Sequence, residues 1–272
     1  MERYKVGIVG FGVVGSAIGF GFAPYHDIAF HDPNIEGSVT LKEIADTSDY
    51  IFVAVPTPQG ASGDPDDTIL NGVLAELDTW TPQGVVAIKS TATPIQLKKY
   101  VDAFESLRIV FNPEFLTERI AKMDFINQTR IILGGAPDDT GEMEELYKTR
   151  FPHLPVFHTD IGTAALVKYM CNSFFAVKVS YLNEFYMLHK AMCVDSEWQD
   201  VISMWLGDCR IGNSHTDVPG PDGQMGWGGK CFPKDTAAAI AFAETLGEQL
   251  RTIEAARETN LDVRGPEDTW EG

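Results

Sequence analysis

The sequence predicts an α/β fold in which an N-terminal parallel sheet is followed by a mainly α-helical domain built on one long helix. Up to about residue 160, short β-branched runs alternate with amphipathic stretches. That alternation is typical of a parallel sheet covered by helices on both faces. Beyond this point the strand-like runs give way to an apolar stripe at helical spacing. We therefore expect a sheet domain over residues 1–160 and a helical domain over residues 161–272.

Six apolar, β-branched runs in the sheet domain predict strands. These runs are Lys5–Val9, Ile28–His31, Tyr50–Val55, Val85–Lys89, Ile109–Phe111 and Arg130–Leu133. Helical spacing is found between them over Leu70–Trp80, Pro94–Phe104 and Asp139–Arg150. Gly- and Pro-rich clusters over Pro56–Asp67 and Gly134–Asp139 indicate turns where strand ends meet solvent.

The helical domain begins with Gly162–Met192, which contains no proline and no further glycine. Apolar residues recur there every three or four positions, namely Leu166, Met170, Phe174, Val177, Tyr181, Phe185, Leu188 and Met192. This spacing predicts one continuous helix of about 45 Å with a single apolar face. Either the face packs on its own chain, or a second subunit covers part of it. A loop over Gly212–Gly229, a helical stretch from Pro233 to about Asn260 and a polar tail of about a dozen residues follow.

Composition narrows the classes of function. The chain carries 21 Lys and Arg against 39 Asp and Glu, a formal charge of −18, so we expect no nucleic-acid partner and no membrane partner. The apolar opening, Val6–Ala23, is rich in glycine and lacks a signal-peptide cleavage pattern. The cysteines (Cys171, Cys193, Cys209 and Cys231) have neither zinc-site spacing nor the density of a disulfide framework. We therefore expect no metal site, reduced thiols and a cytoplasmic protein.

A glycine-rich turn is the first sign of a cofactor. Gly10-Phe-Gly12-Val-Val-Gly15 directly follows the first predicted strand and opens a helical pattern. Such glycines allow a tight turn, a close approach of backbone to a pyrophosphate, and close packing of helix on strand. Asp32 ends the next strand, where a carboxylate binds the ribose hydroxyls of NAD and repels the 2′-phosphate of NADP. Context, spacing and acid together favour a Rossmann-type NAD-binding domain over a functionless turn.

A second cluster, Gly226–Asp235, contains a candidate nucleophile. Pro233 suits the first position of a helix and would place Cys231 just before the helix N-terminus. The helix dipole, Lys230 and Lys234 would then favour the thiolate, which is the nucleophilic form. Taken alone, Cys231 is as compatible with an inert thiol as with a nucleophile. The other cysteines, Cys171, Cys193 and Cys209, are interpreted as structural thiols that behave as small hydrophobes.

Two pairs of polar residues have helical spacing. Lys168 and Asn172 are four residues apart and would donate hydrogen bonds to an oxyanion from one helix face. Glu114 and Glu118 are also four residues apart, after a predicted strand. Without further context, Lys168 is better interpreted as a solvated surface lysine and Asn172 as an unusual residue of a helix interior. Glu114 and Glu118 could share one helical face or be two of many surface acids in an acidic chain.

Taken in order, these motifs resemble the UDP-glucose/GDP-mannose dehydrogenase family of nucleotide-sugar 6-dehydrogenases. The resemblance covers the glycine turn and seven further segments: Val55-Pro-Thr-Pro58, Ser90-Thr91, Asn112-Pro-Glu-Phe-Leu-Thr-Glu118, Lys168-Tyr-Met-Cys-Asn172, Asn183-Glu184, Arg210-Ile-Gly-Asn213 and Gly228-Gly-Lys-Cys-Phe-Pro-Lys-Asp235. Each segment is weak evidence by itself, but the ordered set is specific.

The resemblance implies a four-electron oxidation of a sugar C6 alcohol to a carboxylate by two NAD in succession, with UDP-glucose the expected nucleotide-sugar substrate. Cys231 would attack the intermediate aldehyde to give a thiohemiacetal, which is oxidised to a thioester. Glu114 is the implied general base for thioester hydrolysis. Lys168 and Asn172 would stabilise the oxyanions, and Asp235 would hold Lys168 and an ordered water.

The resemblance also implies contacts to both ligands. Further NAD contacts, besides the glycines and Asp32, are Val13, Val14, Thr57, Thr91, Glu118 and Lys234. Further substrate contacts, besides Glu114, Lys168, Asn172 and Cys231, are Phe115, Leu116, Arg210 and Gly228. Thr91 would contact NAD or the ordered water. Arg210 would reach the neighbouring subunit's sugar site, so a homodimer through the helix 162–192 is expected.

Some positions depart from the resemblance. Arg119, Ala165 and Ile95-Gln96 replace residues that are usual in the family, and little chain follows Asp235, so we expect the family's C-terminal nucleotide-binding domain to be absent. Two other functions stay open. A β-hydroxyacid-type dehydrogenase shares the fold plan and a Lys-x-x-x-Asn pair but needs no cysteine. A non-catalytic NAD-binding module would bind the cofactor without turnover.

Overall fold

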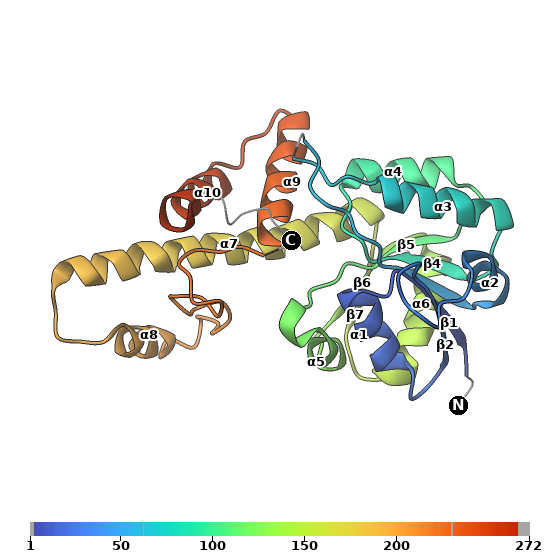
Figure 1. Cartoon of the computed structure of the whole chain (residues 1–272), viewed down its shortest axis with the longest axis horizontal. Coiled ribbons are helices and arrows are strands. Elements are labelled where there is room, and N and C mark those ends of the chain that lie inside the picture. The colour runs from blue at the N-terminus through green and yellow to red at the C-terminus, as the bar shows by residue number, and fades with distance from the viewer. Residues whose placement is uncertain (1–2, 62, 230, 266–272) are drawn as a thin grey trace. The chain divides into compact units, whose positions relative to one another are not determined.

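The computed structural model describes residues 3–61, 63–229 and 231–265 (Figure 1). The chain divides into two compact units, of which the first comprises Met1–Gly60 and Pro65–Lys168. The second comprises Ala61–Asp64 and Tyr169–Gly272. The first unit ends at Lys168, within a helix. The expected domain boundary at residue 160 stays a prediction.

The first unit contains a seven-stranded sheet with the order β2-β1-β3-β4-β5-β6-β7. The strands are β1 (Lys5–Val9), β2 (Asp27–His31), β3 (Tyr50–Val53), β4 (Val85–Ile88), β5 (Ile109–Phe111), β6 (Ile131–Gly135) and β7 (Val156–Thr159). The six predicted strands are all present, with small differences at their ends. β7 was not predicted, because this edge strand is short and its side chains are all partly or fully exposed.

The predicted parallel sheet is confirmed as mostly parallel, with one antiparallel pairing. Strands β1 to β5 are parallel, but β6 pairs antiparallel with β5, and β7 is parallel to β6. Between β5 and β6 the chain forms only a 3-10 turn, η1 (Glu118–Ile120), and the short helix α5 (Ala121–Ile126). These elements do not carry the chain back across the sheet, so the next strand runs in the opposite direction.

Helices cover both faces of the sheet, as expected. On one face lie α2 (Leu41–Thr47), α3 (Thr68–Trp80) and α4 (Pro94–Ala103), and on the other lie α1 (Val13–Phe22), α5 and α6 (Pro137–Arg150). Successive side chains of β3 point to opposite faces of the sheet. Ile51 and Val53 pack in the core under α2, α3 and α4, and Tyr50 and Phe52 pack in the core under α1, α5 and α6.

The helix α4 shows how one of the unusual positions is used. Thr93 caps the helix by accepting a hydrogen bond from the backbone N–H of Gln96 at 3.2 Å. The Gln96 side chain accepts one in return from the backbone N–H of Thr93 at 2.9 Å. With Pro94 as the first helical residue, this capping box determines where α4 begins.

The second unit is mainly helical. It contains most of α7 (Ile161–Met192), followed by α8 (Trp198–Leu206), α9 (Phe232–Thr245) and α10 (Arg251–Arg264). The prediction of one stretch from Pro233 to about Asn260 is wrong, because Gly247 adopts φ +74° and the chain breaks into two helices there. The predicted polar tail is wrong in its first part, which belongs to α10, and 266–272 lie outside the described residues.

The long helix is confirmed as one continuous element. Seven residues of its apolar stripe are exposed by 45% to 62%, namely Leu166, Met170, Phe174, Tyr181, Phe185, Leu188 and Met192. Val177 is half-buried. Of the two alternatives, packing of the stripe on its own chain is therefore wrong for these seven residues, because no described part of the chain buries them.

The cysteines also differ from expectation. Cys193 and Cys209 are exposed, so the interpretation of these two as buried structural thiols is wrong. Cys193 follows the end of α7 with φ +52°, and Cys209 follows α8 in a turn. Cys171 and Cys231 are half-buried. Within the described ranges, no cluster of His, Cys, Asp and Glu could hold a metal ion, and no helix is long and apolar enough to cross a membrane.

We predict that Phe22→Ala lowers the free energy of unfolding by about 3–5 kcal/mol. Phe22 is fully buried at the end of α1 and lies among aromatic rings that include Phe52, Phe125 and Tyr147. Urea denaturation monitored by circular dichroism measures the change. Phe20→Ala on the same helix is the control, because Phe20 is half-exposed and should cost only about 0.5 kcal/mol. Equal losses for both variants would contradict the core packing.

Candidate active site

The predicted site residues of the first unit gather at one edge of its sheet. Gly10, Asp32, Thr57, Thr91 and Glu114 each follow the end of one of the strands β1 to β5. The carboxyl ends of parallel strands share an edge, so the fold brings these five residues to the same side. The chain leaves β1 in one direction for β2 and crosses back over it for β3. Ligands of open α/β sheets bind at such a switch point.

The glycine turn after β1 fits a dinucleotide. Gly10 has φ +84°, and a Cβ there would lie 2.6 Å from the Ala54 carbonyl oxygen. At Gly15 a Cβ would lie 2.0 Å from the Gly10 carbonyl oxygen, so only glycine allows α1 to pack this closely. Gly12, in contrast, is exposed and has no atom within 4 Å of an added Cβ. That open side leaves room for a pyrophosphate at the start of α1, whose N-terminus no side chain caps.

Asp32 supports the glycine turn and keeps acceptor capacity. Its Oδ2 accepts a hydrogen bond from the Phe11 backbone N–H at 2.9 Å, and its Oδ1 accepts one from the Asn34 N–H at 3.0 Å. Each carboxylate oxygen has a second lone pair, so both can also accept from ribose hydroxyls. The site is therefore compatible with NAD.

The other expected NAD contacts differ in exposure. Val13 and Glu118 are exposed, Val14 and Thr91 are half-buried, and Thr57 is buried. Next to Thr91, Ser90 donates a hydrogen bond from Oγ to a backbone oxygen of the segment after β3 at 2.7 Å. The segments after β3 and β4 are thus tied together.

A buried ion pair joins the segment after β5 to α7. Lys168 Nζ donates to Glu114 Oε1 at 2.9 Å and to the Glu114 carbonyl oxygen at 2.6 Å. The second oxygen, Glu114 Oε2, accepts from the Leu116 N–H at 2.7 Å. Burial raises the pKa of Glu114, but Lys168, the Leu116 N–H and Lys89 outweigh it and hold that pKa below its usual value. Glu114 is therefore ionised at neutral pH, as a general base must be.

Lys89, the second lysine whose charge lowers the pKa of Glu114, was not among the expected site residues. Its ammonium donates to Asn112 Oδ1 at 3.1 Å and to the Pro113 carbonyl oxygen at 3.4 Å. The Tyr147 hydroxyl donates to the same Asn112 oxygen at 2.5 Å. The available signal was a lysine directly after the wholly buried strand Val85–Ile88.

In the second unit, a buried carboxylate holds two of the predicted residues. Asp235 accepts from the Asn172 amide at 2.5 Å and from Lys234 Nζ at 2.5 Å. Cys231 is the residue directly before α9, and Pro233 is in its first turn. The predicted position of the thiol at a helix N-terminus is thereby confirmed. Lys234 is paired with Asp235, which offsets its charge, and Lys230 lies outside the described residues.

Buried amides hold the glycine-rich loop that precedes the cysteine. The Gly226 N–H donates to Asn183 Oδ1 on α7 at 2.9 Å. Asn260 on α10 binds both backbone groups of Trp227, accepting from its N–H at 2.6 Å and donating to its carbonyl at 2.8 Å. Sequence reasoning missed Asn260 and Trp227. An asparagine within a helical pattern and a tryptophan within a glycine-rich loop were the available signals.

The remaining predicted substrate contacts lie in different surroundings. Phe115 and Leu116 are half-buried beside Glu114, and the guanidinium of Arg130 lies 4.6 Å from the Phe115 ring centroid. Gly228 is half-buried, and a Cβ there would lie 2.7 Å from the Arg264 guanidinium. Arg210 is 86% exposed and binds Asp208. The Asp235–Lys168 contact that the resemblance implies stays a prediction.

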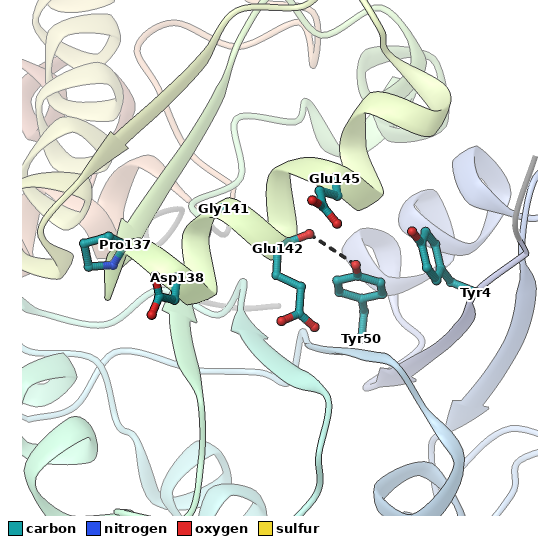
Figure 2. A pocket seen from close by; sticks show the side chains of 7 residues that line it. All are labelled: Tyr4, Tyr50, Pro137, Asp138, Gly141, Glu142 and Glu145. Carbon is teal, nitrogen blue, oxygen red and sulfur yellow. Dashed lines mark hydrogen bonds between the residues drawn. The ribbon is translucent and has the colours of Figure 1, made fainter.

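A shallow pocket in the first unit lies elsewhere (Figure 2). It is lined by Tyr4, Tyr50, Pro137, Asp138, Gly141, Glu142 and Glu145. Tyr50 is the first residue of β3, and its hydroxyl donates to the Glu142 carbonyl at 3.2 Å. The pocket therefore lies toward the amino ends of the strands, away from the predicted residues. Its three carboxylates also suit neither a pyrophosphate nor a nucleotide sugar.

Comparisons with known proteins match two parts of the chain to one family. The UDP-glucose/GDP-mannose dehydrogenase family matches in two parts, its NAD binding domain over residues 27–151 and its central domain over residues 162–262. The UDP-glucose 6-dehydrogenase AglM of Haloferax volcanii is 31% identical over 94% of this chain and 69% of its own length. Several other curated relatives are matched over only about half of their length.

Solved structures show the same fold. A UDP-glucose dehydrogenase from Pyrobaculum islandicum superposes with a TM-score of 0.82 at 26% identity, over 95% of this chain and 68% of that one. A 3-hydroxyisobutyrate dehydrogenase from Mycobacterium tuberculosis has a TM-score of 0.73 at 17% identity, over 94% of this chain and 92% of that one. The second likeness shows the fold alone.

We predict that Gly226→Ala destabilises the protein more than Gly223→Ala. Both glycines have positive φ, +71° and +81°, so each substitution strains the backbone. Only at Gly226 would the new Cβ clash, at 2.3 Å from Asn260 Oδ1. Thermal unfolding should show an additional loss of about 1–3 kcal/mol for Gly226→Ala. Equal losses would mean that Asn260 does not hold the loop.

Proposed function

Because this chain belongs to the UDP-glucose/GDP-mannose dehydrogenase family, we propose that it oxidises the C6 alcohol of a nucleotide sugar, UDP-glucose, to a carboxylate. The observation that carries the proposal is that the residues expected to be catalytic have surroundings that suit their proposed roles. Glu114 is ionised and paired with Lys168, Asn172 is bound to buried Asp235, and Cys231 directly precedes α9. The family's NAD-binding domain supplies the cofactor site.

The residues of the first unit hold the cofactor and keep the general base, Glu114, ionised. The glycine turn and the N-terminus of α1 bind the pyrophosphate of NAD, and Asp32 binds its ribose. When bound, NAD accepts hydride from the sugar carbon, and two NAD are consumed for four electrons. Lys168, together with Asn172 of the second unit, donates hydrogen bonds to the sugar oxygen as it gains negative charge, and the hydroxyl proton passes to solvent water as the aldehyde forms.

Cys231 divides the oxidation of the aldehyde into two steps. The thiolate sulfur adds to C6 and forms a C–S bond, and the carbonyl oxygen becomes the oxyanion of a thiohemiacetal. Loss of a second hydride converts this adduct to a thioester. Glu114 then removes a proton from water, the water oxygen bonds to C6, and the C–S bond breaks. The thiolate is restored and the carboxylate is released.

We further propose that two copies of the chain assemble through α7. Seven exposed apolar residues from Leu166 to Met192 lie along one helix, and contiguous exposed apolar surface of this kind marks interaction sites. Arg210 follows α8 and is almost fully exposed, as a residue that reaches a neighbouring subunit's substrate would be.

The stoichiometry of NADH tests the function. Purified protein with NAD and UDP-glucose should form about two NADH per sugar, measured at 340 nm, with a uronic acid product identified by mass spectrometry. Cys231→Ser should yield no carboxylate, because the serine hydroxyl is a weak nucleophile. Cys171→Ser is the matched control and should retain full stoichiometry.

Two outcomes would contradict the proposal. Full stoichiometry in Cys231→Ser would show that no thioester is needed. One NADH per substrate from a β-hydroxyacid, unaffected by the Cys231 substitution, would favour a β-hydroxyacid dehydrogenase.

We predict that Phe174→Asp weakens self-association. Phe174 is the most exposed residue of the stripe, at 62%, and a buried aspartate there would lack a partner. The dimer dissociation constant should rise at least about 30-fold, as expected for loss of an aromatic anchor. Analytical ultracentrifugation measures it, with Gln199→Asp on α8 as the control for added charge. A wild-type protein that is monomeric at micromolar concentration would refute the dimer.

A further inference from the structure

Two lysines from different elements hold successive carbonyl groups of the segment after β5. Lys89, directly after β4, donates to the Pro113 carbonyl at 3.4 Å, and Lys168 on α7 donates to the Glu114 carbonyl at 2.6 Å. Lys168 also binds the Glu114 carboxylate. The backbone that carries Glu114 is therefore held by ammonium groups at two consecutive peptide units.

The surroundings of Lys89 are unusual for a lysine. Only 6% of the residue is exposed, and its two hydrogen bonds go to neutral oxygens, those of Asn112 and Pro113. A buried ammonium with neutral partners costs free energy, and an apolar side chain of similar shape would avoid that cost. Its presence therefore calls for a role other than stability.

Three titratable groups surround this ammonium, each from a different element. Glu114 lies on the segment after β5, Lys168 on α7, and the Tyr147 hydroxyl on α6 shares the Asn112 oxygen. Burial lowers the pKa of Lys89 to about 7, Glu114 raises it, and Lys168 lowers it. Burial raises the pKa of Tyr147, which stays neutral. In acid, where Glu114 titrates, Lys89 is positively charged and favours the carboxylate.

We propose that Lys89 is a positioning residue for the general base: its buried amine fixes the Pro113 carbonyl and places a positive charge beside the Glu114 carboxylate. This inference rests on the proposed function for the catalytic meaning of Glu114, but not for the coupling between the two side chains. Lys89 itself need not touch sugar or cofactor. Its role is to keep the carboxylate ionised and pointed as the hydrolysis of a thioester requires.

The test compares two neutral variants, Lys89→Met and Lys89→Gln, with Lys99→Met as the control for loss of an exposed lysine of α4. Both variants of Lys89 should raise the midpoint of the acid limb of the kcat–pH profile by about one pH unit. The KM for UDP-glucose should change little, because binding does not involve Lys89. An unshifted midpoint, or a shift in Lys89→Met alone, would overturn the role of the charge.

A second measurement does not depend on activity. The lowered pKa of Glu114 contributes stability that is present above its unfolded-state pKa and is lost as pH falls through its folded-state pKa. The difference in unfolding free energy between the wild type and Glu114→Gln reports this contribution. In the Lys89→Met background, the same difference should be smaller above the unfolded-state pKa, and its loss should be complete about one pH unit higher.

The two measurements separate the proposals. If no nucleotide sugar yields NADH but the stability difference shifts, the proposed function is wrong and the coupling of Lys89 to Glu114 stands. If the stability difference has the same pH dependence with and without Lys89, the positioning role is wrong, whatever the activity.

Discussion

The ion pair between Glu114 and Lys168 is the contact on which the candidate chemistry of the first unit depends. Both side chains are almost fully buried, so each would be a costly uncompensated charge without the other. Lys168 also binds the backbone of Glu114, which ties the beginning of α7 to the carboxyl end of β5. Lys168 thus holds the Glu114 carboxylate in place, contributes most to lowering its pKa and anchors the helix that continues into the second unit.

In each unit, side chains of neighbouring elements hold the backbone at or near a candidate catalytic residue. Around Glu114 these contacts come from two lysine side chains, whereas around the loop before Cys231 they come from the neutral amides of Asn183 and Asn260. The difference is consistent with the proposed chemistry. Nearby positive charge stabilises the ionised form of a carboxylate base. A glycine-rich loop needs only hydrogen bonds that fix its backbone conformation, and neutral amides provide these.

The charge distribution reconciles an acidic chain with anionic ligands. The overall charge is −18, yet the sheet edge that carries the glycine turn also has the N-terminus of α1, Lys89 and Lys168. Acidic residues instead line the shallow pocket near the amino ends of the strands. At the carboxyl edge the Glu114 carboxylate is paired with Lys168, and the N-terminus of α1 is available for an anion, which suits a dinucleotide.

Much could be predicted from sequence, because it depends on local pattern. The strands β1 to β6, the long helix, the glycine turn and the position of Cys231 before a helix all follow from spacing and turn residues. Features that depend on contacts between residues distant in sequence could not be predicted. The antiparallel β6, the break at Gly247, the exposure of Cys193 and the burial of Lys89 emerged only in the folded chain. The direction of a strand, the exposure of a side chain and the pKa of a buried group are set by neighbours that only the tertiary structure brings together.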